Sequence, residues 1–126
     1  MYRKEIEEFI EAHRQEMLDD ICTLCRINSE KMPYKEGMPY VQGAFTALAE
    51  ALSMAEAYGF SITNYDNYVG TADLNDKESQ LDILAHLDVV PAGEGWKETE
   101  PFEPVVKGDK LFGRGTADRQ SQRSTP

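Results

Sequence analysis

The stretch LDILAHLDVV, residues 81–90, is the most apolar segment of strand length in the chain. Its apolar side chains follow one another almost without interruption, which is typical of a central strand buried on both faces of a sheet. His86 and Asp88 interrupt the run shortly before it ends. Because residues i and i+2 of a strand point to the same face, we expect the imidazole and the carboxylate to project together from the end of a buried strand.

The segments before this stretch change from helical to strand periodicity. Residues 2–26 repeat apolar side chains at spacings of three and four, which predicts an amphipathic helix. Residues 28–40 hold two prolines and a glycine and are interpreted as a loop. Residues 42–58 predict a second helix, with Gly59 just past its end.

Two short strands are then expected at residues 60–65 and 67–74, joined by a tight turn at Asp66-Asn67. Residues 101–118 contain further short extended pieces, broken by a turn at Lys107–Lys110. Two helices, a hairpin and a buried strand indicate an α/β layered domain. Such a domain needs further strands, so we expect the sheet of this chain to be incomplete.

Composition excludes several classes of partner. The 126 residues carry 23 acidic and 13 basic side chains, a net charge of −10. Nucleic-acid binding draws its affinity from Lys and Arg, and anionic membrane surfaces attract the same residues, so neither partner is expected. The sequence has no apolar run long enough for a transmembrane helix, and its charged N-terminus does not resemble a signal peptide. We therefore expect a cytoplasmic protein.

Two motifs contain residues suited to chemistry. A histidine such as His86 is a common metal ligand, and a nearby carboxylate such as Asp88 often fixes its tautomer; a structural pair at a strand end is the alternative. The second motif, GRGTAD at 113–118, presents Asp118 after a turn bracketed by Gly113 and Gly115. Taken alone, this motif is interpreted as an ordinary loop that has an acidic tip. Cys22 and Cys25 are interpreted as packing residues of the first helix.

Taken together and in order, the motifs resemble a known family. The pattern is His-x-Asp-x-Val-Pro at 86–91, then Trp96, then Pro-Phe at 101–102, then Gly-Arg-Gly-x-x-Asp at 113–118. It resembles the zinc-dependent aminoacylase/carboxypeptidase-type exopeptidases, and the segment NYVGTADL brings it nearest to the PepV-like dipeptidase branch. The resemblance covers residues 1–118, which we expect to be the N-terminal portion of a metallopeptidase catalytic domain.

This resemblance implies a site with two zinc ions, for which manganese or cobalt are alternatives. His86 would ligate one ion, Asp118 would bridge both, and Asp88 would be the catalytic-site residue that orients His86. The implied substrates are dipeptides or other short peptides. An N-acyl-amino-acid deacylase of the same superfamily and a non-enzymatic remnant that binds a divalent cation weakly are the alternative functions.

After Asp118 the sequence departs from the family. The family continues with Asp-Lys-Gly after this aspartate, whereas this chain reads Arg119-Gln120-Ser121. We expect residues 119–126 to be an aberrant, disordered polar tail. A catalytic zinc normally has three protein ligands, and the motifs supply only two. The sequence therefore predicts a truncated metallodipeptidase that is inactive by itself.

Overall fold

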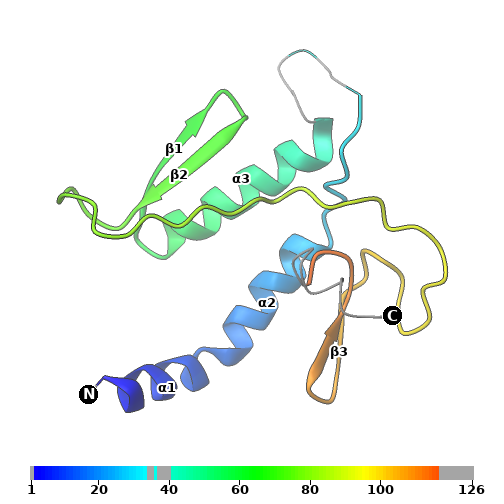
Figure 1. The fold of residues 1–126 in the computed structure, drawn as a ribbon, viewed down its shortest axis with the longest axis horizontal. Helices are drawn as coiled ribbons and strands as arrows, with labels where there is room; N and C mark the ends of the chain where they lie inside the picture. Colours follow the sequence, from blue (N-terminus) through cyan, green and yellow to red (C-terminus); the bar gives the residue numbers. More distant parts are fainter. Residues whose placement is uncertain (1, 34–35, 37–40, 117–126) are drawn as a thin grey trace.

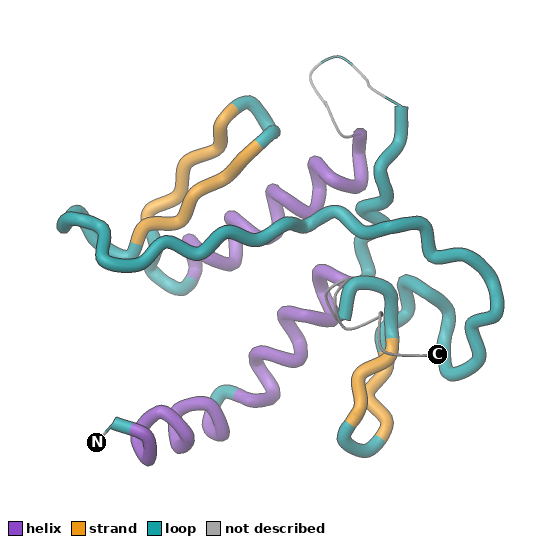
Figure 2. The backbone as a smooth tube through the Cα atoms, viewed as in Figure 1, coloured by secondary structure: helices purple, strands orange, loops and turns teal. Residues whose placement is uncertain are grey.

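The computed structural model describes residues 2–33, 36 and 41–116 of the chain. Figures 1 and 2 show three helices followed by two hairpins in this part of the protein. The α/β class expected from the sequence is confirmed, and the strands form two separate antiparallel pairs rather than one continuous sheet. In chain order, the elements are α1 (Arg3–Ala12), α2 (Arg14–Cys25), α3 (Val41–Ala57), β1 (Ser61–Tyr65), β2 (Val69–Asp73), β3 (Val105–Lys107) and β4 (Lys110–Phe112).

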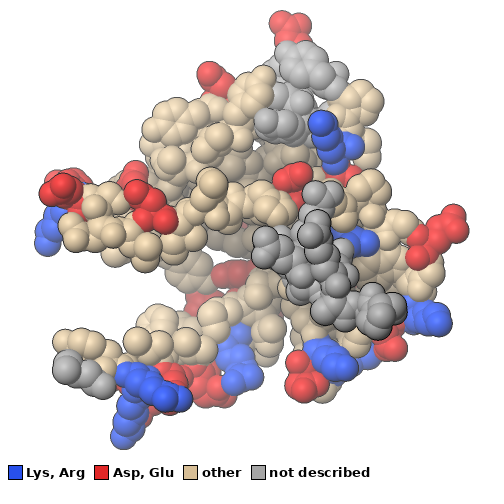
Figure 3. Space-filling view, in the orientation of Figure 1, with Lys and Arg blue, Asp and Glu red and all other residues tan. Residues whose placement is uncertain are grey.

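The single helix predicted over residues 2–26 is observed as two helices with a break at His13. The His13 ring stacks on Phe9 at a centroid distance of 4.1 Å, and its Nδ1 lies 2.8 Å from the Phe9 carbonyl oxygen. The apolar face of α1 remains exposed, with Ile6 and Phe9 more than half accessible. Figure 3 shows α1 standing away from the rest of the molecule across an open groove, so no described element covers this face. Among all the residues that the structure describes, no helix is long and apolar enough to cross a membrane.

The second predicted helix and the first hairpin are confirmed, and they pack on each other. Helix α3 ends before Gly59, which has a φ of 93° and suits the left-handed residue that follows a helix. Asp66 and Asn67 both have positive φ, and β1 and β2 pair from Ser61–Asp73 to Tyr65–Val69. Gly70 brings the hairpin so close to α3 that a Cβ there would meet the Leu52 side chain at 2.7 Å.

The second hairpin, β3–β4, is tied by a two-residue turn. Lys107 pairs with Lys110, and Gly108 in the turn has a φ of 63°. Glycine is the residue that a two-residue hairpin turn favours at this first central position. The predicted turn at Lys107–Lys110 is therefore confirmed.

The central buried strand predicted at residues 81–90 is not observed. The segment is irregular apart from one isolated parallel bridge between Glu30 and Val89. Leu81, Ile83 and Leu84 are 79, 85 and 98% exposed. A central strand needs a hydrogen-bonded neighbour on each side, and among the described residues no strand pairs with residues 81–86. The prediction was wrong for this chain because apolar patterning indicates a tendency to be buried and does not supply the covering elements.

Candidate active site

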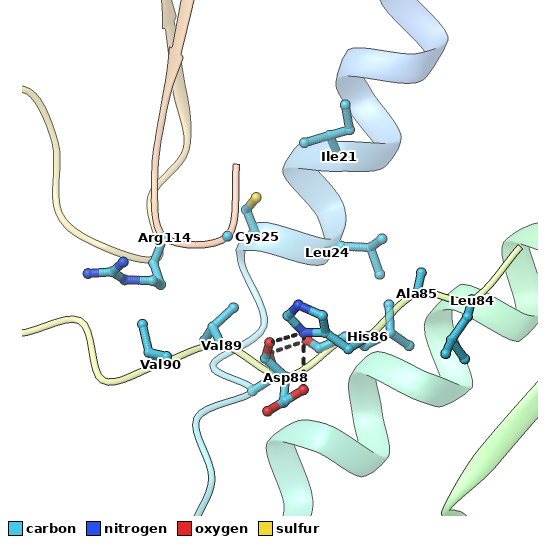
Figure 4. Close-up of a pocket in the computed structure, with 13 residues that line it drawn as sticks. Ile21, Leu24, Cys25, Leu84, Ala85, His86, Asp88, Val89, Val90 and Arg114 are labelled. Carbon is cyan, nitrogen blue, oxygen red and sulfur yellow. Dashed lines mark hydrogen bonds and ion pairs between the residues drawn. The ribbon is translucent and has the colours of Figure 1, made fainter. Parts of the chain in front are cut away.

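The two predicted motifs meet in a cleft of about 630 Å³. Figure 4 shows that three segments line it: the end of α2 with Leu24 and Cys25, the irregular segment with His86 and Asp88, and the turn containing Arg114. At the back of this cleft, the Gly115 backbone packs on Val89, where an added Cβ would meet Val89 Cγ1 at 3.0 Å. The fold thus joins the 86–91 motif to the glycine-bracketed turn, which are more than 20 residues apart in the sequence.

His86 turns back onto Asp88 inside this cleft. Its Nδ1 lies 3.0 Å from the backbone carbonyl oxygen of Asp88 and 3.2 Å from Oδ1 of the same residue (Figure 4). A carbonyl oxygen and an ionised carboxylate are both acceptors, so the geometry favours the tautomer in which Nδ1 carries the proton and donates. In the neutral ring the lone pair then resides on Nε2, the nitrogen through which this histidine could bind a metal.

Both side chains of the pair face solvent, at 65% exposure for His86 and 61% for Asp88. A polar contact that is this exposed contributes little to folding stability. The contact therefore serves mainly to set the orientation of the imidazole.

The backbone around Asp88 is tied to the segment that follows α2. The hydroxyl of Ser29 donates to the Leu87 carbonyl oxygen at 2.8 Å, and the Ser29 carbonyl accepts from the Val89 amide at 3.2 Å. One residue later, a carboxylate oxygen of Glu30 accepts from the Ala92 amide at 3.1 Å. Sequence reasoning missed these partners because nothing in the local pattern around Ser29 or Glu30 marks them.

Arg114 holds the loop that follows the motif. Its guanidinium donates to the Ala92 carbonyl oxygen at 3.0 Å and lies over the Trp96 ring, 5.3 Å from the ring centroid. Trp96 donates from its indole nitrogen to the same carbonyl, also at 3.0 Å. The position of Arg114 between Gly113 and Gly115 was the available sequence signal, since the flanking glycines allow the backbone to approach closely.

Cys25 lines the cleft as a packing residue. It is 6% exposed, and burial raises the pKa of its thiol, with the neighbouring Cys22 raising it further and Arg26 lowering it. A neutral thiol is a weak nucleophile and a weak metal ligand. The packing interpretation of this cysteine agrees with its position.

The metal site implied by the resemblance is only partly described. Asp118 lies outside the described residues. Within the described ranges, no group of three or more His, Cys, Asp or Glu side chains is placed to hold a metal ion. The described residues therefore contribute one histidine with a suitable lone pair, together with the carboxylate that contacts its other nitrogen.

Comparison with known proteins agrees with this reading of the motifs. Residues 83–122, which contain both motifs, match Peptidase family M20/M25/M40. The chain is 35% identical over 115 residues to the Beta-Ala-Xaa dipeptidase of Lactobacillus delbrueckii subsp. lactis, an alignment that covers 89% of this chain and 24% of that protein. It is 37% identical over 117 residues to a protein of Staphylococcus saprophyticus named "Putative dipeptidase", covering 91% of this chain and 23% of the relative.

These similarities define the class first: the segment of residues 83–122 carries the pattern of Peptidase family M20/M25/M40. Within that family its relatives are named as dipeptidases, which agrees with the branch that the sequence resembles. The chain spans about a quarter of the length of these curated relatives.

Proposed function

We propose that this chain is part of a metal-dependent dipeptidase that hydrolyses dipeptides or other short peptides. The observation that carries the proposal is the His86–Asp88 pair, which lies in a cleft with the glycine-bracketed turn and within the segment that matches the peptidase family. The names of the relatives support a peptide substrate over an N-acyl amino acid.

The donor set fits the first part of a metal site. Nδ1 of His86 is engaged by two acceptors, so Nε2 would hold the ion, and Asp88 would keep the ring in that tautomer. Asp118 would bridge two ions in the complete site. Imidazole nitrogen together with carboxylate oxygen suits zinc, with manganese or cobalt as alternatives.

When bound, the metal would supply a Lewis acid that activates water and polarises the scissile carbonyl. The residues of this chain have a more limited part. His86 presents a nitrogen lone pair to the cleft. Asp88 accepts the hydrogen bond that Nδ1–H of His86 donates and so keeps the ring from flipping. Leu24 and Val89 give the cleft apolar walls, which would lower the local water content around a bound peptide.

The remaining expectations accompany this proposal. The acidic charge argues against nucleic acid and anionic membranes as partners, and a cytoplasmic location stays a prediction. The described residues provide only one histidine and its carboxylate for the metal site. We therefore expect the 126-residue chain, assayed alone, to show no dipeptide turnover even when zinc or manganese is added.

A chimera tests the activity directly. Residues 1–118 would replace the aligned segment of the Lactobacillus Beta-Ala-Xaa dipeptidase, and hydrolysis of a β-alanyl dipeptide would be followed with zinc or manganese present. We expect the chimera to be active, His86→Ala to abolish activity, and His13→Ala to leave it near the parent level. His13 is the matched control because it is the other of the two histidines in the chain and lies on the break between α1 and α2.

An active chimera whose turnover survives His86→Ala would contradict the proposal. Binding of zinc to the 126-residue chain, measured by calorimetry with the same two variants, gives an independent result. Zinc binding that weakens on His13→Ala and not on His86→Ala would also overturn it.

A further inference from the structure

Ser29 is a polar residue with almost no access to solvent. It is 2% exposed, in the irregular segment between α2 and α3, and it lines the same cleft as His86. Its hydroxyl donates to the Leu87 carbonyl oxygen at 2.8 Å, and its own carbonyl accepts from the Val89 amide at 3.2 Å. A side chain this deeply buried has to find a hydrogen-bond partner. The side-chain bond and the backbone bond of Ser29 both reach the same short stretch of chain.

The two bonds bracket Asp88. One holds the peptide group on the N-terminal side of Asp88 and the other holds the group on its C-terminal side. The Asp88 backbone is thereby fixed, and its carbonyl oxygen is one of the two atoms that accept from Nδ1 of His86. The chain of contacts therefore runs from Ser29, through the backbone of Asp88, to the imidazole of His86.

Helix α3 packs directly against the backbone next to Ser29. Gly43 in the first turn of α3 packs against the Asn28 carbonyl, where an added Cβ would stand only 1.7 Å from the oxygen. On the other side of Ser29, the Glu30 carboxylate accepts from the Ala92 amide. Ser29 is thus held between two anchored neighbours, which makes it a rigid support for the segment that it contacts.

We propose that Ser29 is a positioning residue for the His86–Asp88 pair. By fixing the backbone on both sides of Asp88, it sets the tautomer and orientation in which His86 presents Nε2 to the cleft. Its consequence for peptide hydrolysis rests on the proposed function, whereas its effect on the imidazole does not.

The imidazole itself provides the first test. The chain has two histidines, so nitrogen-15 NMR of histidine-labelled protein reports both tautomers, with His13 as an internal reference. In the unsubstituted chain we expect His86 to carry its proton on Nδ1. In Ser29→Ala we expect His86 to shift toward the tautomer mixture of an unstructured histidine peptide, while His13 stays unchanged.

Three further variants separate positioning from a general loss of structure. Ser53→Ala makes the same substitution at an exposed position on α3 and should leave His86 unchanged. Ser29→Thr keeps the hydroxyl and should restore the Nδ1–H tautomer. Should Ser29→Ala fail to fold by circular dichroism, Ser29→Cys keeps the volume with a weaker S–H donor and should give an intermediate shift.

The dipeptidase chimera gives the second readout. Loss of a partner that orients a metal-binding histidine typically costs about 10–100-fold in metal affinity or activity. We expect a loss of that size in kcat for Ser29→Ala, with KM little changed and recovery in Ser29→Thr.

The positioning role is overturned if His86 keeps the same tautomer in Ser29→Ala as in Ser53→Ala, even where His86→Ala abolishes hydrolysis. The opposite combination, a tautomer that shifts with Ser29 in a chimera insensitive to His86→Ala, would retain the positioning and reject the proposed function. The two failures are therefore distinguishable.

Discussion

Replacing Gly43 with alanine tests whether α3 fixes the segment that supports the candidate site. A Cβ at this position would stand 1.7 Å from the Asn28 carbonyl oxygen and 2.8 Å from its carbon. Real Cβ atoms stay at least 3.0 Å from such neighbours, so the Asn28 backbone or the first turn of α3 has to shift by at least 1.3 Å, the difference between 3.0 and 1.7 Å. Both partners are backbone, so no side-chain rotation can relieve the contact.

The expected magnitude combines two opposing effects. Overpacking costs about 1–3 kcal/mol, and a clash this deep against backbone belongs at the upper end. Alanine is favoured over glycine inside a helix by about 1 kcal/mol. We therefore expect Gly43→Ala to lower the free energy of unfolding by about 2 kcal/mol. The first turn of α3 would also move relative to Ser29, so the Val89 amide should exchange with solvent faster.

Urea unfolding followed by circular dichroism at 222 nm measures the free energy, and hydrogen exchange resolved by NMR measures the Val89 amide. Ala49→Gly, at an exposed position of the same helix, is the control for helix propensity alone. Gly70→Ala is the comparison in which the added Cβ meets only the ends of the Leu52 and Leu48 side chains, at 2.7 to 3.0 Å; it should cost less than Gly43→Ala. A Gly43→Ala protein as stable as the parent, with unchanged Val89 exchange, would refute the reasoning.

Three further outcomes are expected. The Tyr58 hydroxyl donates to the Asp20 carboxylate, which raises the pKa of this tyrosine; the stability from this bond is present below pH of about 10 and is lost as the pH rises through the raised value. In an absorbance titration at 295 nm, Tyr58 should ionise above the ordinary tyrosine pKa of about 10, and Asp20→Ala should bring this step to lower pH; an unchanged curve would contradict the contact. Burial raises the pKa of the Cys25 thiol, so at pH 8 a disulfide reagent should label Cys22 first and Cys25 slowly, and Cys25→Ser should remove the slow phase and not the fast one. Arg114→Lys keeps the charge but loses the planar group that lies over the single tryptophan. We therefore expect the free energy of unfolding to fall by about 1 kcal/mol and the tryptophan fluorescence emission to shift to the red. An unshifted emission spectrum would argue against the stacking.

Elements that depend on near neighbours in sequence could be predicted. The hairpin turn at Asp66-Asn67 follows from residues that tolerate positive φ, and the end of α3 follows from Gly59. The contact of His86 with Asp88 is also local, because the partners are two positions apart in the sequence. The break at His13 was not predicted, since the apolar periodicity continues through it.

Elements that depend on distant partners could not be predicted. The exposure of Leu84 reflects the lack of a covering neighbour among the described segments, and an apolar pattern carries no information about such a neighbour. Ser29 looks like an ordinary loop serine until it is seen bonded to Leu87, 58 positions along the chain. Arg114 likewise bonds to a carbonyl 22 positions away.

The sequence by itself determined the second predicted helix, the hairpin turns and the family motifs. These properties follow from side-chain chemistry and from spacings of a few residues. The roles of His86 and Asp118 as metal ligands stay predictions. Only the tertiary structure decided that the segment of residues 81–90 is irregular, and that Ser29 brackets Asp88 while Arg114 holds the loop that follows. Hydrogen bonds between distant segments form only when the whole chain brings their donors and acceptors within about 3 Å, and no local pattern encodes that distance.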